Sequence, residues 1–379
     1  MKTAGLTAEF NPFHNGHKYI LERVREQFDA VVVIMSGSFV QRGDAAVTDK
    51  HTRARIALQN GADLVIELPV IYSLNTAQRF AYGAVKTLDA SGVVDAIVFG
   101  SESGDTAALK SVAALLRNEP PEVSEKLKRL MAEGMSYPAA REAAYGGHIT
   151  AGLLSEPNNI LAVEYIRTLM DMGSRMKPVT VRRTNSYHDE SANGDTISAS
   201  AVRKLIREGH NADKYVPEAG FDIYSLSALD NAITYHLRTA APEYLAKIND
   251  VGEGLQNRII RAARERAGFE AICAAAKSKR YTMSRIRRVV LSSFLGLTKE
   301  LCAREPSYIR VLGMNKIGMA LLKEMKHRSS LPVITKTADF EADETFKAEI
   351  RATEAAAICR AGGICAAGRD HTVSPVVLR

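Results

Sequence analysis

The sequence predicts an α/β protein in which a parallel sheet covered by helices is followed by a mostly helical, basic region. Short apolar runs and helical patterns alternate along about the first 210 residues, at spacings that suit right-handed βαβ crossovers. The alternation stops beyond about Gly209, and Lys and Arg residues then become denser. We therefore expect an α/β domain over residues 1–210 and a helical, basic domain over residues 211–379.

The composition is typical of a soluble globular protein. The chain has 379 residues, of which 46% are hydrophobic and 25% are charged, and its net charge is +7. It contains no apolar run of about 18 residues, and its N-terminus enters a strand pattern directly, without the features of a signal peptide. The four cysteines show no C-x-x-C spacing, which indicates reduced thiols. We therefore expect a cytoplasmic protein without a membrane span.

Five apolar runs mark the strands of the expected sheet. A continuous apolar run suits a parallel strand that is buried on both faces. The runs cover residues 3–8, 30–35, 62–68, 96–99 and 178–183. Helical patterns are expected at about residues 19–24, 49–59, 77–88 and 105–145, in a segment that ends near residue 172, and over most of residues 224–330. A short strand-like run follows at residues 331–335.

Three loops follow strands of this sheet, and each carries polar or glycine residues. They span residues 11–17, 36–44 and 100–103. In open parallel sheets, ligands bind at the carboxyl ends of the strands. We therefore expect the three loops to converge on one crevice.

The first of these loops carries two histidines at a junction between a strand and a helix. His14 and His17 flank Gly16 just before the first helical pattern. Free backbone N–H groups and the positive end of a helix dipole favour phosphate at such a junction, and glycine lets a ligand approach the backbone. The alternatives are two unrelated surface histidines or two metal ligands, but no nearby Cys or His completes a zinc tetrahedron. The H-x-G-H pattern resembles the signature of the HIGH nucleotidyltransferase superfamily, which implies phosphate binding by both histidines and transfer at an α-phosphate.

A second stretch, residues 196–204, resembles the other signature of that superfamily, Ile-Ser-x-Ser/Thr-x-x-Arg. It supplies Ser198, Ser200 and Arg203 at the start of an expected helix. Departing pyrophosphate needs positive charge and hydroxyl donors at a helix N-terminus. The alternative is an ordinary capped helix with a solvated basic face.

Four further positions carry two interpretations each. Arg182 and Arg183 end the fifth strand, and one could contact phosphate while the other is a surface charge. Gly100 could allow a nucleoside to approach or simply end its strand. Asn158 could contact a base or cap a helix. The pair His188–Asp189 is more often structural in such a loop.

The densest basic stretch lies in the helical region. Residues 256–300 contain eleven Lys or Arg against three Glu. Such an excess, with a tyrosine inside it, suits a nucleic acid backbone and a stacking platform, whereas the alternative is a solvated helix face. The candidate nucleic acid contacts are Lys279, Arg280, Tyr281, Arg285, Arg287 and Arg288, and we expect them to lie far from the two histidines.

Six motifs together resemble the bacterial tRNA(Met) cytidine acetate ligase family. They are AEFNPFHNGH (8–17), MSGSFVQRG (35–43), FGSE (99–102), PNNIL (157–161), YHD (187–189) and KRY (279–281). The resemblance implies a Rossmann-like nucleotidyltransferase domain that uses ATP and acetate to form N4-acetylcytidine at the wobble position of elongator tRNA(Met), through acetyl-adenylate. It implies an ATP site of Thr7, Ala8, Glu9, Phe10, Asn11, Pro12, Phe13, His14, Asn15, Gly16, His17, Lys18, Tyr19, Ile20, Gly100, Asn158 and either Arg182 or Arg183, to which the second signature adds Ser198, Ser200 and Arg203.

On this interpretation acetate attacks the α-phosphate of ATP, and the cytidine amine then attacks the acetyl group. His14 and His17 are the expected catalytic residues, no side chain acts as a covalent nucleophile, and the first 210 residues suffice for the first step. No side chain is assigned to a metal, although Mg²⁺ can accompany the ATP, and no protein partner is implied. The alternatives are a small-molecule adenylyltransferase and an RNA-binding protein that uses a nucleotide pocket as a switch.

Overall fold

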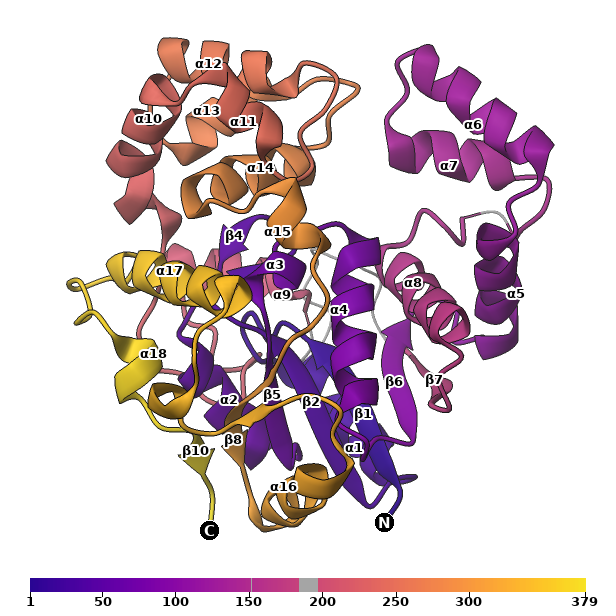
Figure 1. The fold of residues 1–379 in the computed structure, drawn as a ribbon, viewed down its shortest axis with the longest axis vertical. Helices are drawn as coiled ribbons and strands as arrows, with labels where there is room; N and C mark the ends of the chain where they lie inside the picture. The colour runs from indigo at the N-terminus through magenta and orange to yellow at the C-terminus, as the bar shows by residue number, and fades with distance from the viewer. Residues whose placement is uncertain (151, 184–196) are drawn as a thin grey trace.

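An eight-stranded sheet forms the centre of the molecule (Figure 1). The structure is a computed structural model and describes residues 1–150, 152–183 and 197–379. Seven strands follow the order β10-β8-β5-β2-β1-β6-β7, and β9 pairs with β8. The five expected strands are β1 (Thr3–Ala8), β2 (Ala30–Ser36), β5 (Leu64–Leu68), β6 (Ala96–Ser101) and β7 (Lys177–Arg182). They are all parallel to their neighbours within this set, which confirms the predicted α/β fold.

Helices cover both faces of the sheet, because successive side chains of a strand point to opposite faces. In β2, Val31 and Val33 pack with α1 (Asn15–Arg25) and α2 (Lys50–Gln59). Val32 and Ile34 pack on the other face, with α3 (Val70–Ser73), α4 (Ala77–Ala90) and α8 (Pro157–Met172). Every residue of β2 is buried, as its continuous apolar run predicted.

Residues 105–145 form the expected helical insertion. It comprises α5 (Thr106–Arg117), α6 (Pro121–Ala132) and α7 (Tyr137–Tyr145). Figure 1 shows α5 beside α8, with α6 and α7 projecting away from the sheet at the upper right. Among the described residues, no helix is long and apolar enough to cross a bilayer.

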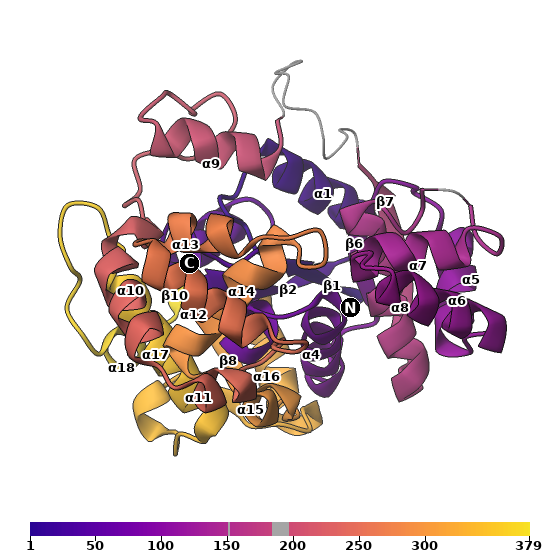
Figure 2. The ribbon, with the colours of Figure 1, turned by 90° about the horizontal axis from the view of Figure 1, so that it is seen from above.

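A helical lobe lies above the end of the sheet that is opposite the N-terminus (Figure 1). It comprises η1 (Leu226–Leu229), α10 (Asp230–Thr239), α11 (Pro242–Lys247), α12 (Leu255–Glu265), α13 (Phe269–Ala276), α14 (Met283–Leu295) and α15 (Lys299–Ala303). A separate helix, α9 (Ala199–Arg207), precedes the lobe and lies on the same side of the molecule as α1 (Figure 2).

After the lobe, the chain returns to the sheet and adds three strands to it, within the residues 211–379 that were expected to form a mostly helical domain. The strand β8 (Ile309–Met314) pairs antiparallel with β5, and β9 (Val333–Ile334) and β10 (Val376–Val377) pair with β8. The remaining elements are α16 (Lys316–Arg328), η2 (Thr337–Asp339), α17 (Glu344–Ile358) and α18 (Arg369–Thr372). The six residues of β8 are all buried, because β8 lies inside the sheet, between β5 and β10.

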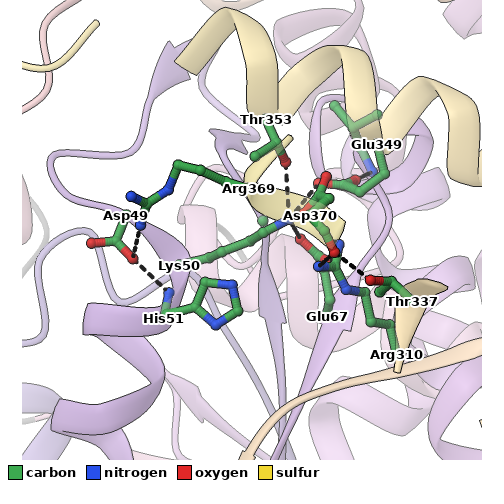
Figure 3. Close-up of polar contacts among 12 residues, drawn as sticks. Asp49, Lys50, His51, Glu67, Arg310, Thr337, Glu349, Thr353, Arg369 and Asp370 are labelled. Carbon is green, nitrogen blue, oxygen red and sulfur yellow. Dashed lines mark hydrogen bonds and ion pairs between the residues drawn. The ribbon is translucent and has the colours of Figure 1, made fainter. Parts of the chain in front are cut away.

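A buried cluster of charges fastens this returning segment to the sheet (Figure 3). Lys50 Nζ lies 2.7 Å from carboxylate oxygens of both Glu67 and Asp370, and Arg310 Nη1 lies 2.9 and 2.7 Å from the same two residues. Glu349 accepts a hydrogen bond from a backbone N–H of α3, and burial, followed by the nearby Glu67, raises its pKa well above the usual value. When Glu349 is protonated and neutral, the cations Lys50 and Arg310 face the anions Glu67 and Asp370, so the charges of the buried cluster balance.

Candidate active site

The loops at the carboxyl ends of β1, β2 and β6 converge on one cavity of about 350 Å³. Fourteen of the predicted ATP-site residues line it, and the rest of the wall comes from Leu6 of β1, Phe99 of β6, the loop residues Gln41 and Arg42, and residues of α4, α8, α9 and α14. The fourteen are Thr7, Ala8, Glu9, Phe10, Asn11, His14, His17, Ile20, Gly100, Asn158, Arg183, Ser198, Ser200 and Arg203. The predicted convergence of the strand-end loops is therefore confirmed.

The two histidines cap the first helix with one nitrogen each. His14 is the N-cap of α1, and its Nδ1 accepts a hydrogen bond from Gly16 N at 3.0 Å. His17 Nδ1 accepts from His14 N at 3.3 Å, and the two ring centroids are 3.9 Å apart. An imidazole nitrogen that accepts a hydrogen bond carries no proton, so in the neutral ring the proton is on Nε2. Helix capping thus leaves each ring with one N–H donor.

Both rings are neutral at physiological pH. Burial first, and then the charges of Arg183 and Arg203, lower the pKa of His14 to about 3. Burial, followed by His14 and Arg183, lowers the pKa of His17 well below its usual value. The histidines therefore offer neutral N–H donors, and the positive charge of the site comes from arginines, of which Arg183 and Arg203 act on His14.

The second signature binds to the first loop through Arg203. Its guanidinium donates to Asn11 O at 2.6 Å and to Ser200 Oγ at 3.0 Å. Ser198 is the N-cap of α9 and accepts from Ala201 N at 3.2 Å. The capped helix that was the alternative interpretation is therefore real, and the same helix N-terminus also lines the cavity.

Of the two arginines that end the fifth strand, the structure places Arg183 at the cavity. Neighbouring residues of a strand point to opposite sides, and Arg182 is exposed, with its side chain against Gly104. A Cβ atom on Gly100 would lie 3.3 Å from both Arg183 Cγ and Ile20 Cδ1. Gly100 therefore leaves the space in which these two side chains meet at the wall.

Glu102 joins the third loop to α8. Its carboxylate accepts hydrogen bonds from Asn158 Nδ2 at 2.6 Å and from Asn159 N at 2.8 Å. Asn159 Oδ1 in turn accepts from the backbone N–H groups of Glu102 and Ser103, each at 3.1 Å. These reciprocal bonds hold Asn158 at the cavity and satisfy free donors at the start of the helix.

Six residues of the predicted ATP segment lie outside the cavity wall, and they are Pro12, Phe13, Asn15, Gly16, Lys18 and Tyr19. Phe13 is buried against the rings of Phe10 and His17. Asn15 Nδ2 donates to Lys214 O at 2.9 Å. Their contacts support the loop rather than face the cavity. The candidates His188 and Asp189 lie outside the described residues.

Arg53 is a supporting residue that the sequence did not reveal. Its guanidinium is fully buried and donates to Glu9 O at 2.7 Å and Ser36 O at 2.9 Å, and also to the carbonyls of Gly37 and Thr48. It therefore joins the loops that follow β1 and β2. An arginine inside a helical pattern carries no local sign of this role, because its partners come from other elements.

The basic stretch at the start of α14 and just before it differs from the prediction in two ways. Tyr281 is 6% exposed and its hydroxyl donates to Glu253 O, so the expectation of a stacking platform is wrong for this buried ring. Arg288 lines the cavity and contacts Gln41 O at 3.4 Å. The expectation that this stretch lies far from the histidine site is therefore also wrong.

All four arginines of that stretch are engaged within the protein, and Arg280 pairs with Glu253 at 2.9 Å. Arg285 and Arg288 form ion pairs with Asp250, at 3.1 and 3.0 Å. Arg287 donates to Gly43 O at 2.9 Å and pairs with Glu270. Because Gly43 belongs to the turn between β3 (Phe39–Val40) and β4 (Asp44–Ala45), the contact of Arg287 attaches the helical lobe to this turn, whereas Asp250 and Glu270 belong to the lobe itself. Lys279 and Arg280 are exposed.

Comparisons with known proteins cover the whole described architecture. Residues 1–367 match the family described as HIGH Nucleotidyl Transferase. The chain is 40% identical over 363 residues to the tRNA(Met) cytidine acetate ligase of Thermoanaerobacter sp. (strain X514), with 90% of each chain covered. It is 36% identical over 415 aligned positions to that of Acetivibrio thermocellus, with both chains covered completely.

A solved structure agrees with these matches. The crystal structure of Thermotoga maritima TmcAL bound with alpha-thio ATP superimposes with a TM-score of 0.89 and 33% sequence identity, and covers 100% of both chains. Among the described residues of the present chain, no group of three or more His, Cys, Asp or Glu side chains is arranged to hold a metal ion. From the full-length matches and the two signatures at one cavity, the chain belongs to the HIGH nucleotidyltransferase family and, within it, to the tRNA(Met) cytidine acetate ligases.

Proposed function

We propose that the protein activates acetate with ATP and transfers the acetyl group to the wobble cytidine of elongator tRNA(Met). The observation that carries this proposal is the cavity in which two neutral Nε2–H donors and two guanidinium groups meet beside the loop of Gly100. This donor set suits a triphosphate. Membership of the tRNA(Met) cytidine acetate ligases supports tRNA(Met) as the acceptor and acetate as the source of the acyl group.

In the first step, a carboxylate oxygen of acetate attacks the α-phosphorus and pyrophosphate leaves. His14 and His17 donate hydrogen bonds from Nε2 to the phosphate oxygens, while Arg183 and Arg203 offset the growing negative charge. Such catalysis is mostly positioning and electrostatic stabilisation. Mg²⁺ bound to the nucleotide would be held mainly by phosphate oxygens and water.

In the second step, the N4 amine of cytidine attacks the acetyl carbonyl and AMP leaves. We propose that the exposed Lys279 and Arg280 contact phosphates of the tRNA, since both lie on the lobe that closes one side of the cavity. Arg287 and Arg288 serve mainly to hold the lobe on the β3–β4 turn, whereas Arg285 pairs with Asp250 inside the lobe. A protein with these substrates would act in the cytoplasm.

The test is incubation of the protein with ATP, labelled acetate and elongator tRNA(Met), followed by measurement of label in the tRNA. We expect ATP-dependent labelling that nuclease digestion traces to N4-acetylcytidine. A folded protein that binds ATP and tRNA without labelling the tRNA would contradict the proposal and favour an RNA-binding switch. A small-molecule adenylyltransferase, the other alternative, is less well supported, because the matched ligases align over 90% or more of this chain.

A further inference from the structure

Glu9 is the one carboxylate among the described residues that line the cavity. It follows β1 and is held at two points. Its Oε1 accepts a hydrogen bond from Gln41 N at 2.7 Å, and its backbone oxygen accepts from Arg53 Nη1 at 2.7 Å. The side chain therefore has a fixed position at the wall.

The second carboxylate oxygen of Glu9 is available to a ligand. The described residues give Oε2 no hydrogen bond, and the atom is not enclosed by protein. Phosphate oxygens are poor partners for a carboxylate, because both carry negative charge. A group that carries a proton is the partner that Oε2 can accept.

The surroundings of Glu9 favour proton acceptance. Burial raises the pKa of its carboxyl above the usual value, against the opposing effects of the Gln41 N–H and of Arg203, Arg42 and Arg53. The charge of Glu9 in turn contributes, after burial, to the raised pKa of the Tyr165 hydroxyl on α8. A carboxylate with a raised pKa is a stronger base, and a base whose pKa lies near the operating pH transfers protons most effectively.

Glu9 also lies where the sheet meets the helical lobe. Gln41 donates its backbone N–H to Glu9, and its backbone oxygen is 3.4 Å from Arg288 Nη1 of α14. One residue thus separates Glu9 from the lobe that carries the proposed tRNA contacts. A cytidine delivered along the lobe reaches the cavity on this side.

We propose that Glu9 is the general base of acetyl transfer, accepting the proton that the cytidine N4 amine loses. This inference rests on the proposed function. The N4 lone pair forms the bond to the acetyl carbon, one N4 proton moves to Glu9 Oε2, and the bond between the acetyl carbon and the phosphate oxygen breaks. AMP leaves with that electron pair, and the amide nitrogen keeps its other proton.

The test is Glu9→Gln, which keeps an oxygen for the Gln41 N–H but removes the basic oxygen. Two rates are measured: acetate-dependent exchange of pyrophosphate into ATP without tRNA, and single-turnover transfer of acetyl from preformed acetyl-adenylate to tRNA. We expect the transfer rate to fall by roughly 10²- to 10⁴-fold, and the exchange rate, which depends on the same cavity, to fall far less. Glu9→Asp should recover part of the transfer rate.

The pH profile separates this role from a structural one. Wild-type transfer should rise with pH as Glu9 ionises, whereas the transfer that remains in Glu9→Gln should lose this limb. An equal loss of both rates, or unchanged transfer, overturns the proposal. If Glu9→Gln does not fold, the comparison of the wild-type and Glu9→Asp pH profiles decides. A wild-type protein that catalyses neither reaction refutes the proposed function itself, whereas failure of the variant prediction alone refutes only the role of Glu9.

Discussion

The imidazoles of His14 and His17 serve two purposes with different nitrogens. Nδ1 of each ring accepts a backbone N–H at the start of α1, and Nε2 is left for the cavity. An asparagine side chain can place its oxygen near the position of Nδ1 but cannot reach the position of Nε2. The two purposes can therefore be separated by substitution.

We predict that His14→Asn folds with a free energy of unfolding within about 0.5 kcal/mol of wild type, because Asn is a preferred N-cap. His14→Ala should lose about 0.5–2 kcal/mol, because it removes the cap. Both variants should lose about 30- to 1,000-fold in the rate of acetyl-adenylate formation, through loss of a phosphate donor. Urea unfolding and single-turnover kinetics measure the two effects, and wild-type kinetics in folded His14→Asn would remove His14 from the phosphate site.

Arg182 and Arg183 form a matched pair for substitution, since they are neighbours of the same type and differ in exposure. Arg183→Ala should weaken ATP binding by about 10- to 100-fold, because a charge-assisted contact is lost. Arg182→Ala should change it by less than about two-fold. Equilibrium titration with ATP provides the measurement, and the reverse order of effects would place the nucleotide elsewhere.

Among single residues, those within a local sequence motif could be predicted. Those whose partners lie far away in the sequence could not. The histidine, serine and arginine positions of the two signatures lie at the cavity, as expected. The ambiguity between Arg182 and Arg183 persisted because a strand end shifted by one residue exchanges the two faces. Arg53 and Arg288 were not assigned to the site, because their roles depend on carbonyls from other elements.

Among the secondary structure elements, the turn between β3 and β4 packs closely against helix α14. Gly43 has a φ of +76°, and a Cβ atom there would lie 2.6 Å from Arg287 Cβ. This glycine is therefore required both by its backbone conformation and by the close approach of the helix. Gly134 has a φ of +91°, but a Cβ atom there would meet no neighbouring atom within 4 Å, which makes it the matched control.

We predict that Gly43→Ala lowers the free energy of unfolding by about 2–4 kcal/mol, as the sum of left-handed backbone strain and overlap with α14. Gly134→Ala should lower it by only about 1 kcal/mol, since only the backbone cost applies. Chemical denaturation of both variants measures the difference. Equal losses would show that the turn and the helix do not pack as closely as described.

Elements with strong periodicity were predicted well, and the returning strand was missed. The five parallel strands and the helices between them lie within a few residues of their expected bounds. The strand β8 was placed within a helical region, because six buried residues between helices, of which Arg310 is charged, show no period that distinguishes strand from helix. Its partner β5 lies more than 240 residues earlier in the chain, so only the tertiary fold identifies it.

For the whole molecule, the sheet and the lobe are coupled more closely than a two-domain division implies. Arg288 belongs to the lobe but lines the cavity, and β8 and β10 complete the sheet from the end of the chain. A fragment of residues 1–210 therefore lacks part of the cavity and part of the sheet, and we do not expect it to form acetyl-adenylate by itself. For the same reason, neutralising Arg287 and Arg288 should affect ATP binding as well as tRNA binding.

Neutralising the exposed pair, Lys279→Ala with Arg280→Ala, should weaken tRNA binding and leave ATP binding unchanged. If both contact phosphates, the slope of log K against log salt should become shallower by up to about 1.4–1.8, at roughly 0.7–0.9 for each phosphate released. ATP affinity should be unchanged, in contrast to the Arg287 and Arg288 double variant. Titrations at three salt concentrations measure the slope, and a wild-type slope would mean that this pair is only solvated.

The central claim is that one cavity, built from the whole chain, joins acetate to the α-phosphate of ATP. Acetate-dependent exchange of labelled pyrophosphate into ATP, measured on the full-length protein without tRNA, tests it most directly. We predict exchange that requires acetate and needs no tRNA, because acetyl-adenylate forms reversibly before transfer. Absence of exchange in a folded protein that binds ATP, or exchange that depends on a phosphorylated metabolite in place of acetate, would contradict it.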